Sequence, residues 1–101
     1  MIVEYLRYSV PEERAEAFVA DYEAAAGPLM ASEHALSFDL CRCVEDATQF
    51  ILRIEWTSAE DHFQKFRGSA EFREFFGHIR PYLDQIDEMR HYQRLIQRPA
   101  P

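Results

Sequence analysis

The sequence contains no asparagine, only two cysteines and three glycines, and no long apolar run. A membrane-spanning helix needs about 20 consecutive apolar residues, so we expect no span. Basic residues are also scarce, because 11 Lys and Arg stand against 18 Asp and Glu, a net charge of −7. Nucleic acid and an anionic membrane surface are therefore not expected partners. Met1 leads into a strand-like segment rather than a signal peptide, which favours a cytoplasmic protein.

The cysteines and histidines show no spacing typical of a metal or redox site. Cys41 and Cys43 are alternate residues of a predicted strand and leave the same face, where a disulfide between them would be strained. No two histidines have the H-x3-H spacing, and none is accompanied by paired cysteine ligands. The chain has four of them: His34, His62, His78 and His91. No phosphate-binding loop is visible either, so we expect no metal, flavin or haem.

The 101 residues suit one domain, which we place at residues 1–97, with a frayed tail at residues 98–101. Alternating apolar residues predict strands at residues 2–9, 36–44, 50–56 and 89–96. The second of these strands is predicted to turn Leu36, Phe38, Leu40 and Val44 to one face. A short turn at Glu45-Asp46 makes the second and third strands an antiparallel hairpin.

An amphipathic helix should follow the first strand. Ser9 and Glu12 have the spacing of a capping box, and Pro11 is tolerated in a first turn. Apolar residues then recur every three or four positions until Gly27-Pro28, where the helix should end or kink sharply.

Residues 48–83 are the most informative part of the chain. The third strand ends at the only tryptophan and turns four apolar side chains to one face: Phe50, Leu52, Ile54 and Trp56. Two short helices follow, opened by Ser58 and Ser69 and stopped by Pro81, and they are rich in phenylalanine. Pockets are common where the end of a strand meets the helices that cover the sheet.

The predicted order, β-α-β-β-α-β, is that of the ferredoxin-like fold in the α+β class. Right-handed crossovers place both helical segments on one face of a four-stranded antiparallel sheet. The opposite face combines Cys41, Cys43 and Ile51 with charged residues. Because exposed apolar surface of this kind is a liability, we expect a homodimer through the open sheet face.

With these elements the chain resembles the antibiotic biosynthesis monooxygenase (ABM) family of dimeric α+β barrels. The most specific part is a strand ending Glu55-Trp56-x-Ser58-x-Glu60, followed by two aromatic-rich helices that end at Arg80-Pro81. The resemblance implies the same sheet, paired as a dimeric α+β barrel. Members of the family include cofactor-independent oxygenases of aromatic polyketides or quinols, haem-degrading enzymes and isomerases, so the family implies fold more firmly than chemistry.

In the polyketide-type members, a pocket under the helices uses an Asn, a Trp, a Tyr and an Arg. By that pattern Trp56 matches the tryptophan and Arg73 the arginine. Leu52 takes the place of the asparagine and His62 that of the tyrosine. The haem-degrading branch needs Asn, Trp and His; this chain has no Asn and carries Phe66 and Phe76 at the other two positions, so haem degradation is not expected.

Trp56, His62 and Arg73 are the candidate catalytic residues. The Trp56 indole N–H is a donor, Arg73 is a fixed cation for an enolate or phenolate, and His62 is suited to proton transfer near neutral pH. A dry pocket would be walled by apolar side chains: Leu52, Ile54, Phe63, Phe66, Phe72 and Phe76. Each catalytic candidate also has a purely structural interpretation: core filling for Trp56, solvation for His62 and a surface ion pair for Arg73.

Two function classes stay open at this level. The first is a cofactor-independent monooxygenase that acts on a small aromatic, quinol or polyketide-like substrate with O2. The second is a non-catalytic dimer that binds a small ligand, or an isomerase on the same fold. Leu52 at the asparagine position favours the second class, and the joint presence of Trp56, His62 and Arg73 favours the first.

Overall fold

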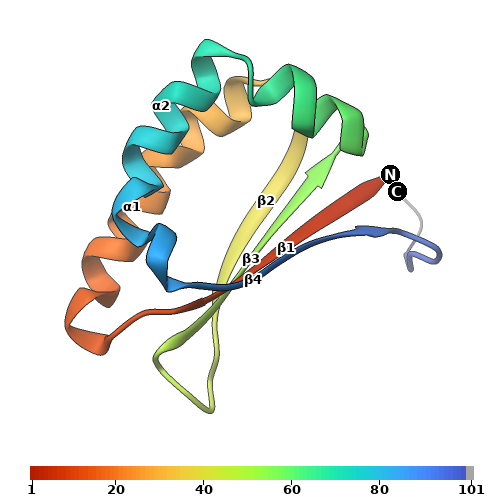
Figure 1. Ribbon diagram of the computed structural model, residues 1–101. Coiled ribbons are helices and arrows are strands. Elements are labelled where there is room, and N and C mark those ends of the chain that lie inside the picture. Colours follow the sequence, from red (N-terminus) through yellow and green to blue (C-terminus); the bar gives the residue numbers. More distant parts are fainter. Residues whose placement is uncertain (100–101) are drawn as a thin grey trace.

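A computed structural model describes residues 1–99, apart from the side chain of Phe63. Its four strands form one antiparallel sheet in the order β2-β3-β1-β4, which is the predicted ferredoxin-like α+β fold (Figure 1). The elements in chain order are β1 (Ile2–Ser9), α1 (Glu12–Ala31), β2 (Ala35–Arg42), β3 (Gln49–Trp56), the π-helical turn η1 (Asp61–Phe66), α2 (Ala70–Ile79), the 3-10 turn η2 (Arg80–Gln85) and β4 (Ile86–Gln93). Within the described part of the chain, no helix is long and apolar enough to cross a membrane.

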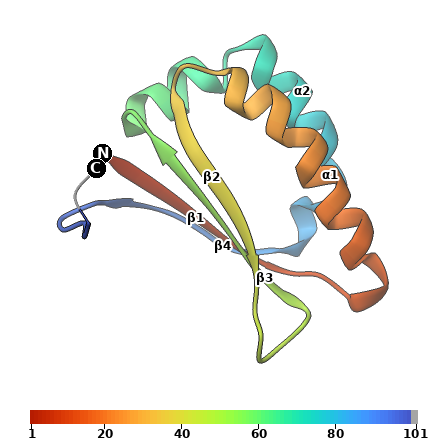
Figure 2. The same ribbon diagram turned by 180° about the vertical axis from the view of Figure 1, so that it is seen from behind.

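Both α-helices cover the same face of the sheet and leave the other face bare (Figures 1 and 2). The apolar face of β3 points toward them, as predicted, and its four side chains are at most 2% exposed: Phe50, Leu52, Ile54 and Trp56. Burial of one such side chain stabilises a fold by about 1.5–3 kcal/mol. The core therefore lies between this face and the helices.

The two serine caps near the tryptophan are confirmed. The Ser58 Oγ accepts the backbone N–H of Asp61 at 2.9 Å, and the Ser69 Oγ accepts that of Phe72 at 3.1 Å. The capping box at the first helix was wrong. Ser9 is the last residue of β1, and its hydroxyl contacts Asp87 and Gln49 instead, so α1 begins at Glu12 without a side-chain cap.

Of the two outcomes predicted at Gly27-Pro28, an end of the helix was wrong, because α1 continues to Ala31. Pro28 has no N–H to donate and so weakens the last turns of a helix. Here Pro28 and Leu29 are both buried in the core. Packing of these side chains offsets the lost hydrogen bond and holds the last turn in place.

Two strand boundaries differ from the prediction. β2 has an irregular register between Ala35 and Ser37, which turns Ala35 inward and leaves Leu36 46% exposed. β2 also ends at Arg42, so Val44 lies in the hairpin loop and is 94% exposed. β4 covers residues 86–93 rather than 89–96, because η2 leads directly into the residues that pair with β1.

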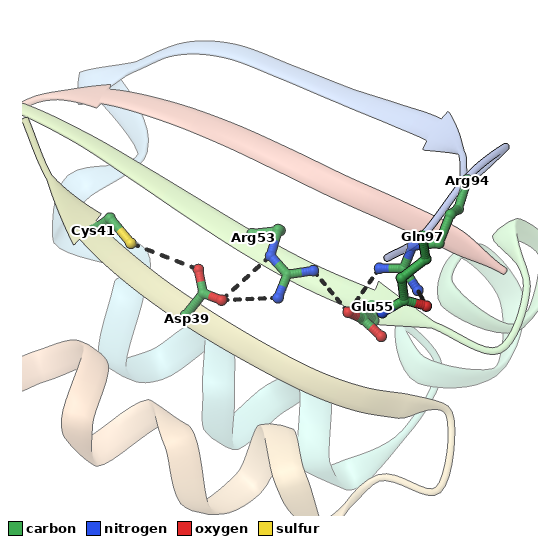
Figure 3. A network of polar contacts seen from close by, with 6 residues as sticks. All are labelled: Asp39, Cys41, Arg53, Glu55, Arg94 and Gln97. Atoms are coloured by element: carbon green, nitrogen blue, oxygen red, sulfur yellow. Dashed lines mark hydrogen bonds and ion pairs between the residues drawn. The ribbon is translucent and has the colours of Figure 1, made fainter. Parts of the chain in front are cut away.

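The bare face of the sheet carries a chain of ion pairs across β2 and β3 (Figure 3). Arg53 lies 2.9 Å from Asp39 and 2.7 Å from Glu55, and Arg94 lies 2.8 Å from the same Glu55 oxygen. Arg94 and Arg53 hold the pKa of Glu55 below its usual value. Ile51, on the same strand face, is 37% exposed, so it lies opposite the helices as predicted.

Tyr8 and Tyr22 form a hydroxyl–hydroxyl hydrogen bond in the core, and neither is more than 2% exposed. Burial raises the pKa of Tyr8 to about 12. Replacing either tyrosine by phenylalanine leaves the other hydroxyl buried without this partner, so we expect each single change to cost about 1–3 kcal/mol of unfolding free energy. The double variant should cost less than the sum of the two, as measured by urea unfolding. Additive costs would show that the two hydroxyls do not interact.

Candidate functional site

A cavity of about 380 Å³ lies between the sheet and the segment η1–α2–η2. Five of the six predicted wall residues line it: Leu52, Ile54, Phe66, Phe72 and Phe76. The sixth, Phe63, has a side chain outside the described residues. A second hollow of about 500 Å³ between α1 and β2 has neither histidine nor tryptophan among its described lining residues. The first cavity is within the size range of small-molecule sites and is mostly apolar.

Glu4 of β1 is the polar centre of this cavity, with only 3% of its surface exposed. The Trp56 indole N–H donates to Glu4 Oε1 at 3.0 Å. His62 Nε2 lies 3.7 Å from Oε1, and His91 Nε2 lies 3.5 Å from Oε2. Burial raises the pKa of the Glu4 carboxyl to about 7, against the lowering effect of the Trp56 hydrogen bond and the Arg67 charge. Glu4 therefore changes its protonation state near neutral pH.

His62 is held by one contact to the face of its ring and one contact to a ring nitrogen. The imidazole stacks on the Trp56 indole with 4.2 Å between ring centroids and 12° between planes. Its Nδ1 lies 2.7 Å from His91 Nε2, a hydrogen-bond distance. Burial, together with His91 and Arg67, lowers the pKa of His62 to about 3, and burial and Arg67 also lower the pKa of His91. Both imidazoles are therefore neutral at pH 7, and the solvated interpretation of His62 is excluded by its 4% exposure.

The structure places Arg73 away from this cluster. The inward face of α2 is formed by residues at three- and four-residue spacing, including Phe72 and Phe75, and Arg73 lies on its exposed side. Among the described residues that line the cavity, the guanidinium comes from Arg67 instead. Arg67 directly follows η1. Its backbone N–H donates to the carbonyl of His62, five residues earlier, at 3.3 Å, which is the hydrogen bond of a π-helical turn.

The sequence predicted that Trp56 and His62 share a site and offered His91 only as a further candidate without a role; Glu4 and Arg67 were missed. One signal was present: Glu4 shares the inward face of β1 with Leu6 and Tyr8, so a carboxylate interrupts an apolar row. His91 pairs with Glu4 across β1 and β4, and that register cannot be read from either strand alone.

The model of the ABM family, whose members are described as antibiotic biosynthesis monooxygenases, matches residues 1–77, more than half of the chain. The chain belongs to the antibiotic biosynthesis monooxygenase family. YczJ of Bacillus subtilis strain 168, described as an uncharacterized protein, is 25% identical over 93 residues, which cover 92% of this chain and 98% of YczJ.

Two solved structures share the ABM fold with this chain. A protein from Bordetella bronchiseptica, provisionally assigned as an antibiotic biosynthesis monooxygenase, superposes with a TM-score of 0.81 at 23% identity, over 94% of this chain and 97% of its own. A variant of SnoaB, a cofactor-independent oxygenase from Streptomyces nogalater, superposes with a TM-score of 0.79 at 16% identity, over 98% of this chain and 97% of its own. At these identities the likeness shows the fold alone.

Proposed function

We propose that this ABM protein is a cofactor-independent monooxygenase of a small aromatic substrate of the phenol or quinol type. The observation that carries the proposal is the buried cluster of Trp56, Glu4, His62 and His91 at one end of an otherwise apolar cavity. Family membership supports the reaction class, and the similarity to SnoaB supports the absence of a cofactor. We also place the protein in the cytoplasm.

In this reaction the substrate supplies the electrons. A ring carbon that carries hydrogen takes up one atom of O2, and the other atom leaves as water together with two hydrogens of the substrate. The neutral His62 imidazole and the Glu4 carboxylate accept the proton that turns the bound hydroxyl into an electron-rich anion. Arg67 at the cavity wall offsets the charge of that anion, and the phenylalanine rings exclude water.

Arg67 and Arg73 provide a matched test of this geometry. Arg67→Ala removes the cavity cation, and a hydrogen bond to a charged group is worth about 1.5–3 kcal/mol. We therefore expect KM for a hydroquinone to rise by roughly ten- to a hundredfold in oxygen-consumption assays. Arg73→Ala should leave KM within about twofold, because its side chain is exposed on α2. An equal loss in both variants would contradict the assignment of Arg67.

A second function is favoured by one residue. Leu52 is buried in the cavity wall at the position where the resemblance to the polyketide-type members places an asparagine. A chain that only binds a ligand would need no such amide. In that case a hydroquinone would change the fluorescence of Trp56, the only tryptophan, without any consumption of O2.

We further propose that the chain forms a homodimer through the bare face of the sheet. Three apolar or aromatic side chains on that face are between 37% and 46% exposed: Tyr5, Ile51 and Tyr92. We expect a dimer mass by light scattering at micromolar concentration. Ile51→Glu should give the monomer mass, because it places a charge in the contact, whereas Val44→Glu in the hairpin loop should not. A monomer mass for the unaltered chain would refute this interface.

A further inference from the structure

The cluster at the cavity has a second chemical capability besides proton transfer. Glu4, His62 and His91 each offer one ligand atom, and these atoms all lie within 4.8 Å of one another. Glu4 and His62 are at most 4% exposed, and His91 is half-buried. The three side chains come from β1, η1 and β4, so the fold converges them from distant parts of the chain.

We propose that Glu4, His62 and His91 form a binding site for one divalent first-row transition-metal ion of the zinc or ferrous class. Two imidazoles and one carboxylate are the donor set that such ions take in sites with open coordination positions. The proposal does not rest on the oxygenase function. It departs from the expectation drawn from sequence spacing, which detects only ligands that lie close together along the chain.

The observed separations suit an ion after small side-chain movements. Ligand atoms on one zinc ion lie roughly 3–3.5 Å apart, as follows from metal–ligand distances of about 2.0–2.2 Å. His62 Nδ1 lies 2.7 Å from His91 Nε2, the other His62 nitrogen, Nε2, lies 3.7 Å from Glu4 Oε1, and His91 Nε2 lies 3.5 Å from Glu4 Oε2. One ion binds only one His62 nitrogen, so the His62 ring must turn slightly and its 2.7 Å contact with His91 must lengthen. The movement is small, because one atom from each of the three residues already lies within 4.8 Å of the other two.

The surroundings also provide an outer shell and an open side. The Trp56 N–H donates to Glu4 Oε1 and orients the carboxylate, as outer-shell donors do in metal sites. The adjoining cavity leaves room for water or a substrate oxygen at the remaining coordination positions. Arg67 acts against binding, since its positive charge is near enough to act on all three ligands. An ion at His62 would also take the lone pair used in proton transfer, so the two roles exclude each other.

The test is direct titration of the chelator-treated full chain. We expect one equivalent of Zn²⁺ by calorimetry, and quenching of the single tryptophan by one equivalent of Co²⁺. Glu4→Gln and His91→Gln should each weaken Zn²⁺ binding by at least roughly 10–100-fold, the loss seen even for outer-shell partners. His78→Gln, a histidine of α2 outside the cluster, should bind as the unaltered chain does.

A further variant separates the site from a general effect on folding. Arg67→Ala keeps all three ligands and removes the opposing charge, so it should tighten Zn²⁺ binding severalfold, whereas Arg73→Ala should not. No binding at one equivalent, or equal losses in His78→Gln and His91→Gln, would overturn the proposal. Circular dichroism of each variant shows whether a loss of binding reflects unfolding. Because no substrate is present, these outcomes are independent of the oxygenase test.

Discussion

Replacement of His62 by phenylalanine is expected to lower turnover of a hydroquinone by roughly 100- to 10,000-fold, the usual contribution of a general acid–base group. Phenylalanine keeps a flat ring against the Trp56 indole, where the imidazole stacks at 4.2 Å, and removes both nitrogens. The cavity wall and the core therefore keep their packing. The unfolding free energy is expected to fall by at most about 1–3 kcal/mol, because His91 Nε2 loses the partner that His62 Nδ1 provides at 2.7 Å.

The control for this variant is His78→Phe on α2. It makes the same chemical change at a position outside the cavity lining, so turnover should stay within about twofold. Oxygen consumption, measured with chelator-treated protein at saturating hydroquinone, compares the two. Turnover of His62→Phe at the unaltered rate would show that His62 only packs on Trp56.

Glu4→Gln should make the metal-free protein more stable and less active. The glutamine oxygen still accepts the Trp56 N–H, whereas the buried negative charge is removed. Burial raises the pKa of Glu4 from 4.5 to about 7, so above pH 4.5 the unfolded chain loses this proton first and ionisation favours unfolding. The expected gain at about pH 8 is up to about 3 kcal/mol, since each pKa unit corresponds to 1.36 kcal/mol.

The sign of this effect is tested by its pH dependence in urea unfolding. At about pH 4, below both pKa values, the stability difference between Glu4→Gln and the unaltered chain should largely vanish. Turnover should fall roughly tenfold or more, because Glu4 no longer accepts a proton. Glu88→Gln, an exposed carboxylate on β4, should change neither quantity. A Glu4→Gln protein that is less stable at about pH 8 would contradict the cost assigned to the buried carboxylate.

The fold could be predicted from the sequence where a local pattern, such as apolar alternation or a helix cap, determines the structure by itself. The alternation of β3 placed Trp56 under the helices, and Ser58 and Ser69 marked two helix starts. The predicted ends of helices and strands were wrong where tertiary contacts, rather than local sequence, determine them. Burial of Pro28 extended α1, and pairing with β1 moved β4 by three residues.

The candidate site was predicted only in part, for a physical reason. Trp56 and His62 lie on neighbouring elements, and their approach follows from a short connection. Glu4 and His91 meet through the register between β1 and β4, which depends on the whole sheet. Arg67 lines the cavity directly after η1, whereas Arg73 lies on the exposed side of α2, and the apolar spacing of α2 indicates that side only once the helix bounds are known.

Cofactor-independent oxygenation is tested most directly by single-turnover oxidation of a hydroquinone by chelator-treated protein under isotopically labelled O2. We predict one labelled oxygen atom in the product by mass spectrometry, formed by the unaltered chain at a rate that added metal does not increase. We also predict that His62→Phe forms the labelled product roughly 100- to 10,000-fold more slowly. Unlabelled product, or labelled product only after Fe²⁺ is added, would contradict cofactor-independent oxygenation.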